Sequence, residues 1–160
     1  MVFMLDTCVI NRILDGRLGN EWSLRGGNFV TDIQLQEILD TKDPARRRNL
    51  LYGLIELHPN VIRPTDAPQW LDGGEKFDTG ERFLTGMGTV WHTARIPEAF
   101  GCIAPVVARA LPANSKRPEN PLRDGFIVEA AMLYSMTLVT ADTKLGRVAR
   151  RLGIDVELIP

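Results

Sequence analysis

Four acidic side chains have the types and positions that could perform chemistry, and they are Asp6, Glu37, Asp124 and Asp142. The first and the last of them directly follow apolar, strand-like runs at residues 2–5 and 137–141. In an open parallel sheet, ligand sites form just beyond the carboxyl ends of the strands. We therefore expect carboxylates from distant parts of the sequence to meet in one crevice.

Clustered carboxylates repel one another, and this repulsion indicates what the crevice would bind. Two unit charges about 4 Å apart cost roughly 4 kcal/mol at an effective dielectric near 20. Protons or a divalent cation can offset that energy. Oxygen ligands favour hard cations, so the acidic residues predict a site for Mg²⁺ or Mn²⁺.

Strands and helices that alternate along the chain would position these acids. Apolar runs predict short strands at residues 2–5, 61–62, 137–140 and 155–159, and residues 28–30 are either a short strand or a lead-in to the next helix. Helical patterns and their start and stop signals predict helices at 7–14, 32–39, 44–57, 97–110, 122–134 and 143–152. The alternation predicts a three-layer α/β/α domain with a mainly parallel central sheet.

Local signals fix the ends of several of these helices. Thr31 with Gln34 three residues later is a capping-box pattern, and Asp43 followed by Pro44 is typical of a helix start. The helix that follows residue 121 is apolar nearly all round, which predicts that it lies inside the domain. Asp124 in its first turn would then face apolar neighbours and would need a partner.

Length and composition limit the domain organisation and the function. The 160 residues, 44% apolar and 24% charged, predict one domain over residues 1–160 with a substantial core. Residues 65–120 are the least regular part, and we interpret them as an elaboration of the same domain. The formal net charge of −1 provides no overall basic field, so nucleic-acid contacts would depend on patches such as Arg-Arg-Arg at 46–48 or Lys-Arg at 116–117.

The two cysteines and the apolar runs indicate the compartment. Cys8 and Cys102 form neither a disulfide framework nor a zinc-binding spacing, which favours a reducing cytoplasm. No stretch approaches the roughly 20 apolar residues that span a bilayer. We expect a soluble protein with no membrane contact.

The four acids and their surroundings together resemble the PIN-domain ribonucleases, a family that includes the VapC-like toxins. The resemblance rests on Leu-Asp-Thr at residues 5–7, Glu37, Arg-Asp-Gly-Phe-Ile at 123–127 and Leu-Val-Thr-Ala-Asp at 138–142. The order and placement of all four acids agree with the family pattern. The resemblance covers residues 1–62 and 121–160 and hardly constrains the middle of the chain.

The resemblance implies a role for each of these residues. The principal metal-binding carboxylates would be Asp6, Asp124 and Asp142. Glu37 would be the helix-borne catalytic acid, while Thr140 and Thr7 would support the site with their hydroxyl groups. Cys8 stands where the family frequently has asparagine, which puts one polar contact in question.

The resemblance also implies an activity. Members of the family use Mg²⁺ or Mn²⁺ to cleave RNA by hydrolysis. In metal-assisted hydrolysis one ion lowers the pKa of a water, and a second ion, if present, offsets charge on the leaving 3′ oxygen. VapC-like members are held inactive by an antitoxin. The stretch between Glu37 and Asp124 is longer here than in the compact toxins, and its aromatic residues could form a surface for a homodimer or a partner: Trp70, Phe77, Phe83 and Trp91.

Each of the acids has a simpler structural interpretation. Asp6 and Asp142 could only cap the helices that follow them, and Asp124 could pair with Arg123. Glu37 falls away from the apolar stripe of its helix and could be a solvated surface residue, and Asp32 competes with it as the helix-borne acid. Glu129 is expected on the polar face of its helix, and Cys8 is expected to be a small packing residue.

An inert module is the alternative function. Such a protein would keep the PIN-like fold without the chemistry and would bind RNA or a protein partner. An intact nuclease should be stabilised by Mn²⁺ unless Asp6 is replaced by asparagine, whereas an inert module should show no such effect.

Overall fold

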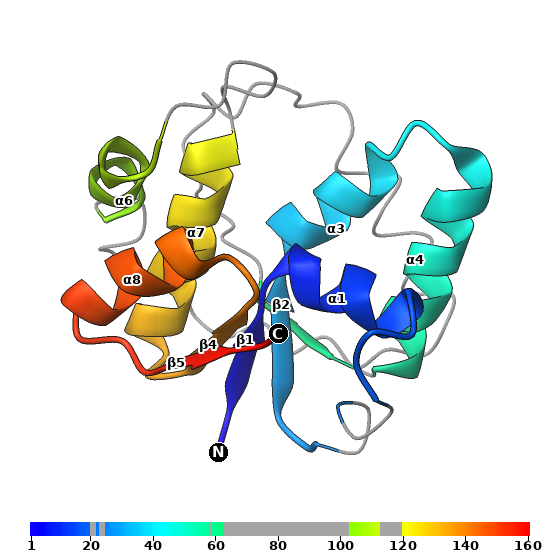
Figure 1. Cartoon of the computed structure of the whole chain (residues 1–160), viewed down its shortest axis with the longest axis horizontal. Coiled ribbons are helices and arrows are strands. Elements are labelled where there is room, and N and C mark those ends of the chain that lie inside the picture. Colours follow the sequence, from blue (N-terminus) through cyan, green and yellow to red (C-terminus); the bar gives the residue numbers. More distant parts are fainter. Residues whose placement is uncertain (20–21, 23–24, 58, 63–102, 113–119) are drawn as a thin grey trace.

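The computed structural model describes residues 1–19, 22, 25–57, 59–62, 103–112 and 120–160. Within these ranges the chain is an α/β protein with five strands and six helices (Figure 1). Most of the expected elaboration at 65–120 lies outside the described residues, as do its four aromatic side chains. The Lys-Arg pair at 116–117, Cys102 and the expected start of a helix near residue 97 also lie outside them.

The five strands form one sheet in which every pairing is parallel, and this confirms the expected sheet type. The strand order is β3-β2-β1-β4-β5. The chain therefore builds outward from β1 through β2 to β3 and then returns to place β4 on the other side of β1. This reversal makes the boundary between β1 and β4 the topological switch point, where open α/β sheets form their ligand sites. The strands are β1 (Phe3–Leu5), β2 (Asn28–Thr31), β3 (Asn60–Ile62), β4 (Thr137–Thr140) and β5 (Val156–Leu158).

Five of the described helices begin and end close to the predicted residues, whereas α6 begins at Ala104 and not near residue 97. The Gln34 side-chain oxygen accepts a hydrogen bond from the backbone N–H of Thr31 at 2.7 Å, and the Asp43 carboxylate accepts one from Ala45 N–H at 2.9 Å. Both contacts satisfy backbone groups at a helix start. None of the helices in the described ranges is long and apolar enough to cross a membrane. The helices are α1 (Thr7–Leu14), α3 (Asp32–Leu39), α4 (Pro44–Glu56), α6 (Ala104–Ala110), α7 (Asn120–Leu133) and α8 (Thr143–Arg151).

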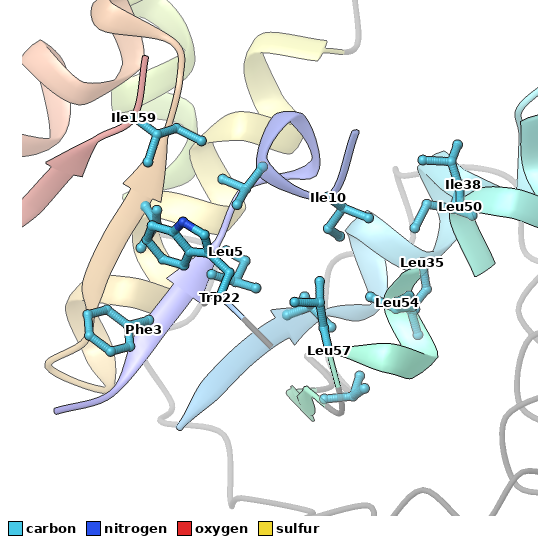
Figure 2. Packing of buried hydrophobic residues seen from close by; sticks show 14 residues of the cluster. Phe3, Leu5, Ile10, Trp22, Leu35, Ile38, Leu50, Leu54, Leu57 and Ile159 are labelled. Atoms are coloured by element: carbon cyan, nitrogen blue, oxygen red, sulfur yellow. The ribbon is translucent and has the colours of Figure 1, made fainter. Parts of the chain in front are cut away.

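Two hydrophobic cores lie on opposite faces of the sheet, because alternate residues of a strand point to opposite sides. Phe3 and Leu5 of β1 belong to the first core, which α1, α3 and α4 cover. Figure 2 shows this core extending from Phe3 and Trp22 to the side chains between α3 and α4. Met4 belongs to the second core, which α6, α7 and α8 cover. The arrangement is compatible with a three-layer α/β/α fold.

A third, smaller cluster joins three helices. Ile33 of α3, Ala104 of α6 and Phe126 of α7 are all buried in it. Gly125 permits this packing, because a Cβ at that position would lie only 2.4 Å from the carbonyl oxygen of Ala104. The cluster therefore holds α3 and α7, the two helices that carry Glu37 and Asp124, against each other.

Candidate functional site

Two of the four acids follow neighbouring strands at the switch point. Asp6 comes directly after β1, and Asp142 lies two residues beyond the end of β4. The backbone N–H of Asp6 donates a hydrogen bond to the carbonyl oxygen of Val139 at 3.0 Å, so the pairing of the two strands continues to Asp6 itself. Because the strands are parallel, both acids stand at the carboxyl edge of the sheet.

Thr140 connects these two acids. Its hydroxyl group donates a hydrogen bond to Asp6 Oδ2 at 2.6 Å and accepts one from the backbone N–H of Asp142 at 2.9 Å. Thr140 is fully buried, and Asp6 is only 7% exposed. A hydrogen bond to a buried carboxylate fixes its orientation, so Thr140 sets the position of Asp6 relative to the start of α8.

Cys8 packs against the first core, as expected, and it is also a second hydrogen-bond partner of Asp6. Its thiol donates to Asp6 Oδ2 at 2.9 Å, and its sulfur accepts from the backbone N–H of Ala141 at 3.1 Å. Burial, together with the charge and the hydrogen bond of the neighbouring Asp6, raises the pKa of the thiol to about 12. Cys8 therefore stays protonated and remains a donor at physiological pH. Its place in the family pattern, where asparagine is frequent, was the signal for a polar role.

The two possible helix caps differ. Asp6 occupies the N-cap position of α1, yet its side chain makes no capping hydrogen bond, so the simple capping interpretation of Asp6 is wrong. Asp142 does cap α8, because its Oδ1 accepts from the backbone N–H groups of Lys144 at 2.7 Å and Leu145 at 3.1 Å. This cap engages only one carboxylate oxygen, and the Asp142 residue is exposed.

Glu37, on α3, contacts α1 at the same edge of the sheet. Its side chain is partly buried, and the hydroxyl group of Thr7 donates a hydrogen bond to Glu37 Oε2. Thr7 is the first residue of α1 and directly follows Asp6. Glu37 is therefore not the freely solvated surface residue of the simpler interpretation, and α1 orients both acids.

Asp124 lacks a direct partner in the described part of the chain. Arg123, its expected structural partner, instead contacts Asp40 with an N–O distance of 3.4 Å. Burial, together with the negative charges of Asp6, Glu37 and Asp142, raises the pKa of Asp124 to about 8. The other three acids are thus close enough to act on Asp124, and the pairing of Asp124 with Arg123 is wrong.

The charge of this acidic cluster decides which ligand it suits. At neutral pH and without a cation, burial and the repulsion from the other acids keep a proton on Asp124. Among the residues that the structure describes, no group of three or more His, Cys, Asp or Glu side chains is arranged to hold a metal ion. The suitability for Mg²⁺ or Mn²⁺ therefore comes from an all-oxygen donor set and unbalanced negative charge rather than from a preformed coordination shell.

Glu129 is buried instead of lying on a polar face, so that expectation is wrong. Its two carboxylate oxygens accept hydrogen bonds from the backbone N–H groups of Ile103 at 3.2 Å and Ala104 at 2.9 Å. It thereby caps the start of α6, which covers this side of α7. The apolar character of α7 on all sides was the sequence signal for its burial.

The arginine triplet is partly used by the fold. Arg46 pairs with Asp15 at 2.5 Å and also donates to Asn11 at 2.8 Å, so it joins α4 to α1. Arg47 donates to two backbone carbonyl oxygens at 3.4 Å. Only Arg48 of the triplet is exposed, so most of this patch is not available to contact RNA.

Comparison with known proteins assigns no family to the chain. No model of a protein family matches the chain, and no curated protein matches it.

Proposed function

We propose that this chain is a metal-dependent endoribonuclease of the PIN-domain type. The observation that carries this proposal is the hydroxyl group of Thr140, which links Asp6 to Asp142 at the switch point. The buried hydroxyl of Thr140 donates to the carboxylate of Asp6 and accepts from the backbone N–H of Asp142, so it fixes the orientation of Asp6 at the start of α8. This preorganisation is what catalytic sites need, since loosely held groups lose much of their effect. The resemblance of the four acidic motifs to PIN-domain ribonucleases supports the same function.

The residues that would hold the cation are Asp6, Asp124 and Asp142. When bound, Mg²⁺ or Mn²⁺ would lower the pKa of a water molecule and stabilise negative charge on the phosphate. The cation would also take the place of the proton on Asp124, because a positive charge favours the ionised carboxylate.

The chain's own residues orient the reacting groups. Thr140 and Cys8 both donate to Asp6 Oδ2 and leave its other oxygen for a ligand. Thr7 holds Glu37 toward the same edge. In the reaction, the water oxygen bonds to phosphorus as the bond to the 3′ oxygen breaks, and the proton released from water finally reaches that 3′ oxygen.

A role as the toxin of a toxin–antitoxin pair is part of this proposal. The acidic cluster suits occlusion by a basic segment of an antitoxin, because an arginine can pair with the carboxylates that would otherwise hold a cation. Such a nuclease would act on RNA in the cytoplasm. Expression of the wild-type chain alone should then arrest bacterial growth, and expression of the Asp6→Asn variant should not.

An inert PIN-like module that binds RNA or protein is the second candidate. One observation favours it: within the described ranges, the acidic side chains are not arranged as a ready metal site. The two functions differ in whether RNA is cut.

RNA cleavage decides between them. Purified wild-type protein should cleave single-stranded RNA with Mg²⁺ or Mn²⁺ and not with EDTA, while Asp6→Asn should lose at least about a hundredfold in rate. Asp155→Asn is the matched control, because this exposed aspartate precedes β5 at the opposite edge of the sheet. Equal cleavage by wild type and Asp6→Asn would contradict the proposal.

A further inference from the structure

The exposed face of α8 carries a row of positive charge. Its nine residues include four cations and no acid. Lys144, Arg147 and Arg151 are all exposed and are spaced three and four residues apart, so they lie on one side of the helix. We call these three residues the basic stripe.

The basic stripe differs from three arginines that the fold pairs with acids. Arg25 pairs with Glu157 at 3.0 Å, Arg46 with Asp15, and Arg123 with Asp40. Across the described ranges, no residue of the basic stripe forms an ion pair or side-chain hydrogen bond. Arg150 does not belong to the stripe, because its guanidinium donates to the carbonyl oxygen of Val156 at 3.1 Å.

Helix stability does not explain this arrangement. Lys144 lies in the first turn of α8, where the helix dipole disfavours a cation. Arg147 and Arg151 are four residues apart, and like charges at this spacing repel each other. Only Arg151, in the last turn, has a favourable position relative to the dipole. The stripe as a whole therefore opposes folding of the helix, and an anionic ligand would relieve its repulsion.

The position of the stripe relates it to the acidic cluster. Asp142 caps α8 and accepts a hydrogen bond from the backbone of Lys144, so the stripe begins within one turn of the cluster. From there α8 leads away from the ends of β1 and β4 (Figure 1). The three side chains span about 10 Å along the helix axis, which matches roughly three phosphates of a stacked strand.

We propose that the basic stripe binds the phosphate backbone of the RNA strand next to the bond that is cut. This inference rests on the proposed function and adds the path of the substrate. The acidic cluster alone repels a polyanion, and the stripe would supply the attraction that brings the strand to it. Phosphate contacts position a strand without reading its bases, so the stripe contributes affinity and no sequence preference.

Binding measured without cleavage tests this inference. Fluorescence anisotropy with a labelled single-stranded RNA of about 12 nucleotides, in EDTA, gives the Kd over a range of salt concentrations. The full chain with Lys144→Gln, Arg147→Gln and Arg151→Gln together should bind at least about tenfold more weakly at low salt. Its plot of log K against log salt should be shallower by roughly 2, since each lost single-strand phosphate contact removes about 0.7.

Two further variants separate charge from structure. Lys144→Arg with Arg147→Lys and Arg151→Lys keeps the charges and should keep most of the affinity. Arg48→Gln on α4 removes an exposed charge on the opposite side of the sheet and should change neither Kd nor slope. Thermal unfolding of the neutral triple variant should be unchanged or occur at a higher temperature, because the repulsion is gone.

Cleavage of short and long substrates distinguishes the two proposals. The neutral triple variant should lose about tenfold in kcat/KM on the long RNA and little on a dinucleotide, which is too short to follow α8. Unchanged RNA affinity and salt slope in this variant would overturn the stripe proposal even if the wild type cleaves RNA. If the wild type binds RNA through the stripe but never cleaves it, the nuclease proposal fails while RNA binding stands. Tighter stripe-dependent binding of polyglutamate than of RNA would assign the surface to an acidic protein and overturn the RNA assignment.

Discussion

Two carboxylates on the same helix, Asp124 and Glu129, have opposite surroundings. Glu129 is fully buried, and both of its oxygens accept backbone hydrogen bonds at the start of α6. Asp124 is partly buried, accepts no hydrogen bond within the described residues and is repelled by three other acids. One carboxyl group is part of the structure, and the other keeps a proton because it is buried among acids whose charge the structure does not balance.

The difference shows how a structural acid can be told from a functional one. Burial alone does not distinguish them, since Glu129 is the more deeply buried of the two. Unbalanced charge at a topological switch point does, because a fold retains such a cost where the charge serves a ligand. Replacing each acid should therefore have opposite effects on stability.

Removing Glu129 should produce the largest loss of stability. Glu129→Ala leaves two buried N–H groups without an acceptor, and each such group costs about 1–3 kcal/mol. The free energy of unfolding, from urea denaturation, should fall by roughly 2–5 kcal/mol. Asp155→Asn should stay within about 0.5 kcal/mol as an exposed control. A Glu129→Ala protein as stable as wild type would show that the start of α6 does not depend on this carboxylate.

Replacing Asp124 should stabilise the protein, and the gain should depend on pH. The folded protein holds the Asp124 proton up to a pKa of about 8, whereas the unfolded chain releases it near pH 4. Wild type therefore loses stability as the pH rises from about 4 to about 8, and Asp124→Asn lacks this loss. Melting temperatures in EDTA should differ little near pH 4 and most above pH 8. A constant difference across this range would contradict the electrostatic coupling of the four acids.

Adding Mn²⁺ provides a control for this pH effect. A bound cation stabilises the ionised form of Asp124, so the wild type should regain stability at high pH in the presence of Mn²⁺. Asp124→Asn should gain less. Equal gains in both proteins would place the cation away from Asp124.

Replacing Cys8 should have the smallest effect of these changes. The replacement should lower kcat and leave the affinity for RNA unchanged. Cys8→Ala removes the donor to Asp6 and the acceptor for Ala141 N–H, and a lost hydrogen bond of about 1 kcal/mol corresponds to a roughly five- to tenfold lower kcat. Cys8→Ser retains a donor and should restore most of that rate. The affinity for RNA should not change in either variant. If alanine and serine give the same kcat, Cys8 only fills space.

Much of the fold followed from the sequence, because its signals are local. Apolar runs predicted four of the five strands in the described ranges and left β2 as one of two possibilities, and the pairing of Thr31 with Gln34 located the start of α3. The contacts within the site depend on strand pairing instead: Thr140 meets Asp6 across 134 positions of sequence. Likewise, Glu129 was misjudged because the helix that covers it lies 25 residues away in sequence. Side-chain partners of this kind require the tertiary structure.

Binding of Mn²⁺ to the purified full chain tests the central claim, that the acids at the switch point form one cation site. Isothermal titration calorimetry should give one set of sites for wild type and for Asp155→Asn. Binding should be lost or weakened at least about tenfold when Asp6, Asp124 or Asp142 is replaced by asparagine, because each removes a charged ligand. Equal affinity for Mn²⁺ in wild type and in all three of these variants would contradict the account.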